Sequence, residues 1–252
     1  WGPWGGFLSE LNSQPFANDL EKMLQRVVAQ VKSIGKKWFI LPNYQVTLKV
    51  MYTTQAHIPT KGSVNFKYTT DEGALKFKEL LEDIVLVRGT HVVHFGGHAG
   101  PGLIAFPDEE GNAILFGLCA QNRTSYSCVD VSQVWSGYPK PFASIRVVYL
   151  GGCKSFLSPS LPQEFVNRGA WSAVGWKVVV ISFFRIRDEA PHRAFWYTLC
   201  GDPHRKIVGK TVLEAAKAAG ETYRGLLDFD WPLRPSWGTY VGVAGNGSVK
   251  LY

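Results

Sequence analysis

Apolar residues follow two alternating spacings along this chain from about residue 46 onward. Short runs rich in Val, Ile, Tyr and Phe have the length and composition of β-strands. Between them, apolar residues recur every three or four positions, as they do on the buried face of a helix. Strands that alternate with helices predict an α/β fold, in which a mainly parallel central sheet is sandwiched by helices.

The individual elements follow from these spacings and from capping and turn residues. The predicted strands are 46–53, a short or edge strand at 64–68, 90–95, a hairpin of 103–106 and 113–116, 145–150, 173–184 and a last strand within 237–252. The predicted helices are 20–31, 71–84, 130–135, 162–168, 188–199 and 208–223, with Asp71, Asp130 and Asp188 as N-caps. Residues 118–129 are expected to form an irregular loop.

No change in composition marks a clear domain boundary. We divide the chain into residues 1–45, a helical segment that packs on the core or on a partner, and residues 46–252, the main domain. Because the chain begins with Trp1 instead of Met, we expect a processed product or an excised domain. The side chains of Trp1 and Trp4 would suit packing against another domain or a partner.

Charge and hydropathy narrow the classes of partner. No apolar run reaches the roughly 18 residues of a membrane span, so no membrane segment is predicted. The net charge of +7 would suit an acidic partner or nucleic acid. The basic residues are scattered, however, without a basic–aromatic stripe, which argues against direct nucleic-acid binding by this domain.

The four cysteines suggest neither a metal site nor a disulfide framework. They are Cys119, Cys128, Cys153 and Cys200, none in a C-x-x-C pair and none at metal-ligand spacing from a His. A 252-residue chain with a sizeable core does not need disulfides. We therefore expect reduced thiols, a cytoplasmic location and no metal ion.

Two segments carry the candidate chemistry. Residues 90–95 and 145–150 are apolar runs with the length of buried strands, and a Gly-Gly pair follows each of them. His98 follows the first pair and Cys153 the second, which places both at the C-terminal edge of the sheet, where ligands gather in open α/β folds. A Cys and a His brought together there make an activated thiol nucleophile. The backbone N–H groups of Ala99 and Cys153 are the candidate donors to an oxyanion.

Each residue alone also has a structural interpretation. A cysteine at a strand end is often a small buried hydrophobe, and a histidine there is often a hydrogen-bonding partner. The matching Gly-Gly contexts favour the functional interpretation for the pair. Of the other histidines, His94 would help to position the turn beside His98, and His57, His192 and His204 are expected at the surface or in caps.

At these residues the chain resembles the caspase-like cysteine peptidases, and among them the CHAT family, relatives of caspases and separase. The family motif His-Phe-x-Gly-His-Gly is similar to residues 94–99 (HFGGHA), and the nucleophile segment is similar to residues 152–155 (GCKS). In caspases the His also precedes the Cys by about fifty residues. The similarity spans about residues 85–225 and continues downstream in 165–170, 174–181, Phe184, Asp188, 195–199 and 212–216.

The resemblance implies a caspase-haemoglobinase-like fold and a cysteine endopeptidase acting on a protein substrate. It implies that Cys153 attacks the scissile carbonyl and that His98, the second His of the motif, gives a proton to the leaving amine. No metal or cofactor is needed for this chemistry. The resemblance further implies control by a sensor domain or partner subunit, in defence or cell-death pathways.

The chain also departs from the family pattern. Ala99 replaces a Gly, and Gly151 stands where several relatives carry an acid. Asp188 matches a substrate-binding acid of some relatives and is equally a helix N-cap. Arg185 and Arg187 would instead bind an acidic P1 side chain, so the P1 preference stays open.

Three other hypotheses remain beside the peptidase. They are a non-catalytic caspase-like module that binds partners, a different α/β enzyme that uses the Cys for acyl transfer, and a nucleic-acid binder. The peptidase hypothesis makes one geometric prediction. The Cys153 sulfur and a ring nitrogen of His98 should lie within about 7 Å of each other.

Overall fold

The computed structural model describes residues 92–95, 98–106, 116–120, 127–133, 136–180, 190–201, 207–227 and 235–251. The helical segment 1–45 and the elements predicted at 46–53, 64–68 and 71–84 lie outside these residues. Within them, the chain forms two four-stranded sheets and the helices α3, α4 and α5.

The central sheet has the order β1-β6-β7-β8. Strands β1 (Val92–Phe95), β6 (Val147–Leu150) and β7 (Ser172–Trp176) are parallel, and β8 (Val241–Gly245) pairs antiparallel with β7. Every residue of β6 and β7 is buried, as expected for strands covered on both faces. The prediction of an α/β fold with a mainly parallel sheet is therefore confirmed.

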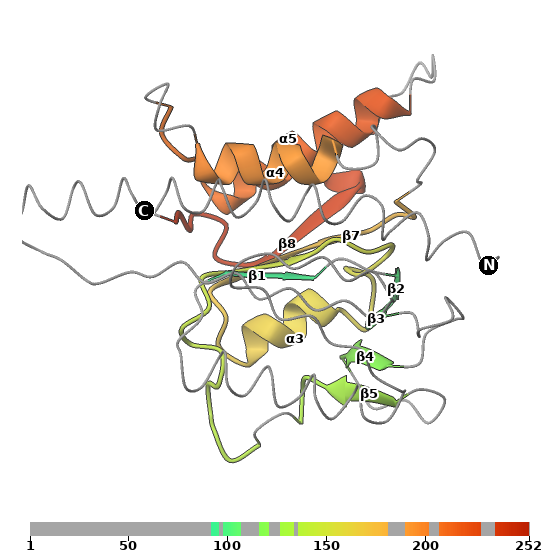
Figure 1. Cartoon of the computed structure of the whole chain (residues 1–252), viewed down its shortest axis with the longest axis vertical. Coiled ribbons are helices and arrows are strands. Elements are labelled where there is room, and N and C mark those ends of the chain that lie inside the picture. Colours follow the sequence, from blue (N-terminus) through green and yellow to red (C-terminus); the bar gives the residue numbers. More distant parts are fainter. Residues whose placement is uncertain are drawn as a thin grey trace, which may run out of the picture.

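Helices lie on both faces of this sheet. Figure 1 shows α3 (Leu161–Asn167) on one face, and α4 (Ala190–Cys200) with α5 (Val212–Leu226) on the other. Two hydrophobic clusters correspond to the two faces. The α3 side packs Phe142, Ile145 and Phe165, and the α4–α5 side packs Trp176, Trp196 and other aromatic residues.

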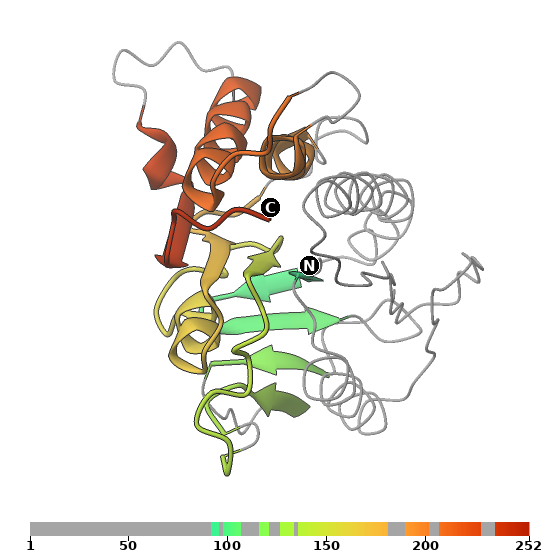
Figure 2. The same cartoon turned by 90° about the vertical axis from the view of Figure 1, so that its left-hand side faces the viewer.

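A second sheet, of order β2-β3-β4-β5, was only partly predicted. Its strands are β2 (His98–Gly100), β3 (Leu103–Phe106), β4 (Phe116–Cys119) and β5 (Ser127–Asp130). Strands β2, β3 and β4 are antiparallel, and β5 is parallel to β4. In Figure 2 these green strands lie away from the orange and red helices α4 and α5, and the residues Ala99, Ile104 and Leu118 join the α3-side core.

Two predictions in this region were wrong. Residues 118–129 are not one irregular loop, because they include the end of β4 and most of β5. Asp130 does not start a helix. It ends β5, and its carboxylate accepts hydrogen bonds from the Ser132 N–H (2.9 Å) and hydroxyl (2.6 Å), which closes a turn.

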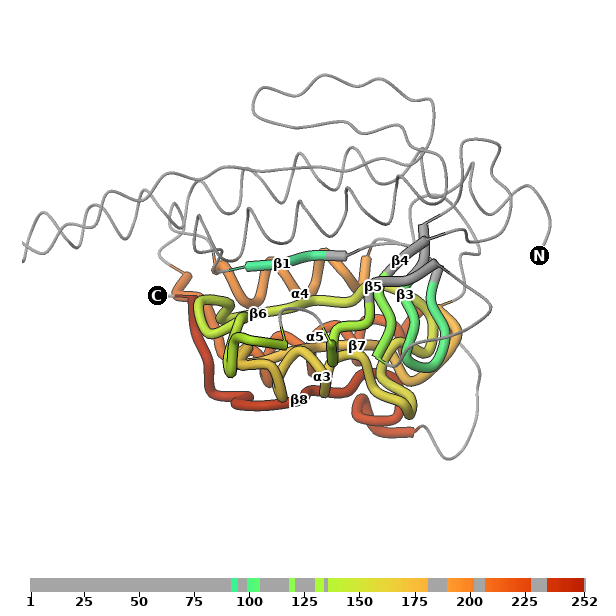
Figure 3. The backbone as a smooth tube through the Cα atoms, turned by 90° about the horizontal axis from the view of Figure 1, so that it is seen from below, coloured from blue at the N-terminus to red at the C-terminus, as the bar shows by residue number. Residues whose placement is uncertain are grey.

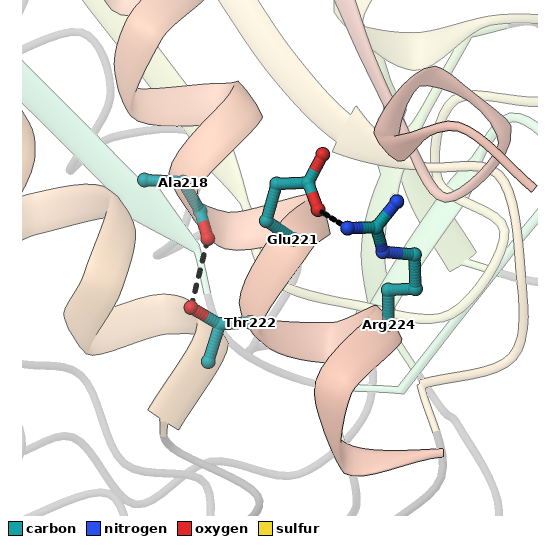
Figure 4. A network of polar contacts seen from close by, with 4 residues as sticks. All are labelled: Ala218, Glu221, Thr222 and Arg224. Carbon is teal, nitrogen blue, oxygen red and sulfur yellow. Dashed lines mark hydrogen bonds and ion pairs between the residues drawn. The ribbon is translucent and has the colours of Figure 1, made fainter. Parts of the chain in front are cut away.

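The bounds of β7 and α5 also differ from those predicted. Of the predicted strand 173–184, only β7 is strand, and residues 177–180 leave the ladder while 181–184 lie outside the described residues. Helix α5 starts at Val212 and not at 208, because Thr211 and Glu214 form a capping box there. Figure 3 shows β1, β6, β7 and β8 one after another from top to bottom, in the order of the central sheet. The last turns of α5 carry a bond from the Thr222 hydroxyl to the Ala218 carbonyl (2.8 Å) and an ion pair between Arg224 and Glu221 (Figure 4).

The expectation of four reduced thiols was wrong. Cys119, at the end of β4, is disulfide-bonded, whereas Cys153 and Cys200 are free. The side chain of Cys128 lies outside the described residues. The sequence argument failed because a sufficient core removes the need for a disulfide without preventing one. Cysteine usage therefore no longer favours a cytoplasmic location.

Candidate active site

The two strands that precede the candidate residues end side by side. Phe95 of β1 lies opposite Leu150 of β6 in the parallel register, so both strands end at the same edge. One Gly-Gly pair then separates Phe95 from His98, the first residue of β2, and the other separates Leu150 from Cys153. The predicted placement of both residues just past two neighbouring strand ends is thereby confirmed for the backbone.

Most of the other predicted site residues have side chains or positions outside the described residues. The side chain of His98 lies outside the described residues, so the distance of about 7 Å between the imidazole and the sulfur stays a prediction. Ala99, the predicted oxyanion donor, is buried in β2 opposite Ile104. Arg185, Arg187 and Asp188, the predicted substrate-binding residues, lie outside the described residues.

Cys153 sits at the start of a tight reversal of the chain. Lys154 has a φ of 54°, a left-handed conformation that is costly for a residue with a side chain. The reversal brings residues 153–157 back alongside residues 176–180. The Lys154 N–H donates to the Val178 carbonyl at 2.8 Å, and the Phe156 N–H donates to the Trp176 carbonyl at 2.9 Å. These bonds hold Cys153 beside the segment that follows β7.

Among the described residues, the Cys153 sulfur exchanges hydrogen bonds with Val180. The Val180 N–H donates to Sγ at 3.3 Å, and the thiol donates to the Val180 carbonyl at 3.6 Å. Partial burial raises the pKa of the thiol above its usual value. The Val180 backbone bond, the thiol's own backbone N–H and the Lys154 charge act in the opposite direction on that pKa. The resting form is therefore the thiol, and a base is needed to make it a nucleophile.

A buried serine, to which the sequence analysis gave no role, anchors the reversal. The Ser155 hydroxyl donates to the Leu150 carbonyl at 3.2 Å and accepts from the Trp176 N–H at 3.0 Å. It therefore connects the end of β6 to the end of β7 at the point where the chain turns toward Cys153. Its only signal in the sequence is its place in the GCKS segment, since nothing local shows that its partners come from two different strands.

Two glycines make room for this reversal. A Cβ on Gly175 of β7 would lie 2.8 Å from the Ser155 oxygen, and one on Gly242 of β8 would lie 2.5 Å from the Phe156 ring. Both contacts are closer than side chains tolerate, so the sheet can accept the reversal only where it lacks side chains. The Lys177 ammonium lies 5.5 Å from the centre of the Phe156 ring.

A cluster of rings lies between the same strands and helix α4. His94 and Tyr149 are register partners on β1 and β6, and their rings stack with centroids 5.3 Å apart. The Trp196 indole N–H donates to His94 Nδ1 at 3.3 Å, so His94 is the neutral tautomer with its proton on Nε2. Tyr149 Oη and His192 Nδ1 are 2.7 Å apart.

Burial makes both histidines of this cluster hard to protonate. It lowers the pKa of His94 to about 3, helped by the nearby His192, and it lowers the pKa of His192 to about 4. The expectation that His192 lies at the surface or in a cap was wrong, because its ring packs edge-on against Tyr149 and Trp176. Its position early in α4 hid this contact, which depends on tertiary packing.

Comparison with known protein families, curated proteins and solved structures finds no match. The part of the chain that the structure describes contains no group of three or more His, Cys, Asp or Glu arranged to hold a metal ion. Within the same residues, none of the helices is long and apolar enough to cross a bilayer.

Proposed function

We propose that this chain is a cysteine endopeptidase of the caspase-like, CHAT kind, which cleaves a protein substrate with Cys153 and His98. One observation carries the proposal: β1 and β6 are neighbours in parallel register, and matching Gly-Gly pairs lead from their paired last residues to His98 and Cys153. Such an edge is where α/β folds place their ligands and reacting groups. The resemblance of residues 94–99 and 152–155 to the family motifs supplies the reaction class.

The chemistry assigns each group a role. His98 takes the thiol proton, and the Cys153 sulfur attacks the scissile carbonyl carbon to form a tetrahedral intermediate. The N–H groups of Ala99 and Cys153 hold the oxyanion, and each is worth about 3 kcal/mol in the transition state. The intermediate collapses as His98 passes the proton to the leaving amine, and water then hydrolyses the thioester. The resemblance further leads us to propose control by a sensor domain or partner subunit, as in defence pathways.

The raised pKa of Cys153 makes the histidine necessary in this scheme. A half-buried thiol that is protonated at neutral pH needs a base within reach before it can attack. His94 is a poor candidate for that base, because the Trp196 indole occupies its Nδ1 and burial holds its pKa near 3. His98 is therefore the histidine that we assign to proton transfer.

A peptide-library cleavage assay tests the proposal. The parent chain should cleave a subset of peptides, and Cys153→Ala and His98→Ala should each lose that cleavage. Cys200→Ala is the matched control, because Cys200 is the second reduced cysteine among the described residues and lies buried at the end of α4. Cleavage that persists unchanged in both site variants would refute the assignment.

A second candidate function is a non-catalytic caspase-like module that binds partners. One observation favours it: the Cys153 thiol already exchanges hydrogen bonds with Val180, as a structural cysteine would. An acyloxymethylketone probe separates the two candidates. A peptidase should be labelled at Cys153, with labelling lost in His98→Ala, whereas a binding module should remain unlabelled in both chains.

A further inference from the structure

The reversal that presents Cys153 depends on one buried hydroxyl that takes no part in the proposed chemistry. We propose that Ser155 is a positioning residue, whose hydroxyl fixes residues 153–157 against β7 so that the Cys153 sulfur meets the backbone N–H of Val180. This inference deepens the proposed function and rests on it.

The two partners of Ser155 make it an anchor for both sides of the reversal. Leu150 is the last residue of β6, directly before the glycines that lead to Cys153, and Trp176 is the last residue of β7. The hydroxyl donates to the first and accepts from the second, and the Ser155 side chain is fully buried. Strands β6 and β7 are hydrogen-bonded to each other in the sheet. Because the Ser155 hydroxyl binds the last residue of each strand, its position is fixed relative to the sheet.

The backbone between these anchors is in a conformation that the chain would not adopt unaided. Lys154, between Cys153 and Ser155, is left-handed. Such a conformation persists only where the surrounding contacts over-determine it. Removal of the hydroxyl would leave the buried Trp176 N–H without its partner and would free the reversal to relax.

The sulfur would respond to that relaxation although Ser155 does not touch it. The Val180 N–H reaches Sγ only while the reversal lies along residues 176–180. A donor to sulfur favours the thiolate, and it is the largest of the effects that oppose burial at this thiol. Loosening of the reversal should therefore move the titration of Cys153 to higher pH.

The test measures the rate of alkylation of Cys153 by iodoacetamide, followed by peptide mass spectrometry on the full chain from about pH 6 to about pH 10. In Ser155→Ala we expect the midpoint of the pH–rate profile to rise by about one unit. The rate near neutral pH should fall roughly tenfold, in proportion to the thiolate fraction.

A second variant displaces the Ser155 hydroxyl by a substitution in β7. In Gly175→Ala the new methyl group would lie 2.8 Å from the Ser155 oxygen and would displace it. The same upward shift of the profile is expected. Gly137→Ala is the matched control, because no atom lies within 4 Å of a Cβ at that position and its profile should not move.

The outcomes are distinct. A profile that stays in place in Ser155→Ala, although the melting temperature falls, would make Ser155 merely structural and overturn the proposal. If Ser155→Ala does not fold, the profile of Gly175→Ala decides in the same way. A shifted profile in a chain that cleaves no peptide supports the positioning role and counts against the peptidase, and an unshifted profile in an active peptidase does the reverse.

Discussion

Cys153 and Cys200, the two reduced cysteines among the described residues, differ in how deeply they are buried and in where they lie in the fold. Cys200 ends α4, is buried, and has its pKa raised to about 12 by burial. Cys153 stands at the edge of the central sheet, where a backbone N–H and a lysine charge partly offset the effect of burial on its pKa. The same side chain is therefore inert in one place and can be activated in the other, because of donors and access that the fold supplies.

The two cysteines are also held in place by different kinds of interaction. The Cys153 reversal is held by backbone hydrogen bonds and by Ser155, within a few residues of the sulfur. Cys200 is protected by a whole helix, α4, which packs on the sheet through the rings of His192, Phe195 and Trp196. Changes that loosen α4 should expose Cys200, and changes near residues 153–157 should alter Cys153 alone.

The largest expected effect is the difference in reactivity itself. At neutral pH, the iodoacetamide rate at Cys153 should exceed that at Cys200 on the order of 1,000-fold, because a thiol with a pKa of about 12 is almost entirely protonated and is also buried. Peptide mass spectrometry after timed quenching measures both rates in one sample. Equal rates in the folded chain would contradict the comparison, and full labelling of both in denaturant is the control.

The second-largest expected effect is a loss of stability in acid, which arises from the two buried histidines in the ring cluster beside α4. In the folded chain the pKa of His94 is about 3 and that of His192 about 4, against 6.5 for the unfolded groups. Between these pKa values the histidines bind protons in the unfolded chain but not in the folded chain. Their contribution to the free energy of unfolding is therefore fully present above about pH 6.5 and is lost as the pH falls toward the folded pKa values. Because the two rings retain some exposure, we expect a loss of about 3 kcal/mol for the pair near pH 5.

Denaturant unfolding at about pH 7 and about pH 5 measures this loss. His94→Phe keeps a ring beside Tyr149 and removes one of the two titrating groups, so it should reduce the difference between the two pH values by about half. A parent chain with the same unfolding free energy at both pH values would show that the histidines are not held neutral.

A substitution at the end of α4 should open the same region without acid. Gly201 has a φ of +66°, and a Cβ there would clash with the Ile207 carbonyl oxygen. Gly201→Ala therefore combines a left-handed residue with a clash against backbone, and we expect it to lower the free energy of unfolding by roughly 2 kcal/mol. Cys200 should become more reactive while Cys153 keeps its rate. Gly100→Ala, with no atom within 4 Å of its Cβ, is the control.

The backbone of the candidate site was predictable because its signals are local. The runs that became β1 and β6 are each followed by a Gly-Gly pair, which the sequence shows directly. Their parallel pairing agrees with the predicted mainly parallel sheet, although the chain between them forms the second sheet. The predicted helix 162–168 became α3 for the same reason, since Ser160 accepts from the Gln163 N–H as its cap.

What the sequence hid depends on contacts between distant segments. The apolar run that continues past Trp176 suggested one long strand. Residues 177–180 do not extend β7, and the Val178 carbonyl instead accepts a hydrogen bond from the Lys154 N–H of the Cys153 reversal. The role of Ser155 depends on partners from two strands, and the second sheet is built of strands of only three or four residues, too short for a clear periodicity. The disulfide at Cys119 has no local signal either.

The smallest expected effect concerns the charge beside the sulfur. Lys154 is exposed, and its ammonium favours the thiolate of Cys153 through space. Lys154→Gln removes that charge and keeps a side chain at the left-handed position, so the backbone strain is unchanged. We expect the alkylation rate of Cys153 near neutral pH to fall roughly threefold, because an exposed charge acts through solvent.

Salt and a second lysine separate this electrostatic effect from a structural one. Because mobile ions screen exposed charges, the threefold difference should disappear near 1 M salt. Lys140→Gln is the matched control, since Lys140 is also exposed and lies beside Gly169, where α3 ends. A rate in Lys154→Gln that falls equally at low and high salt would mean that the reversal itself has moved. Ser155 and Val180, and not the lysine, would then account for the difference between the two thiols.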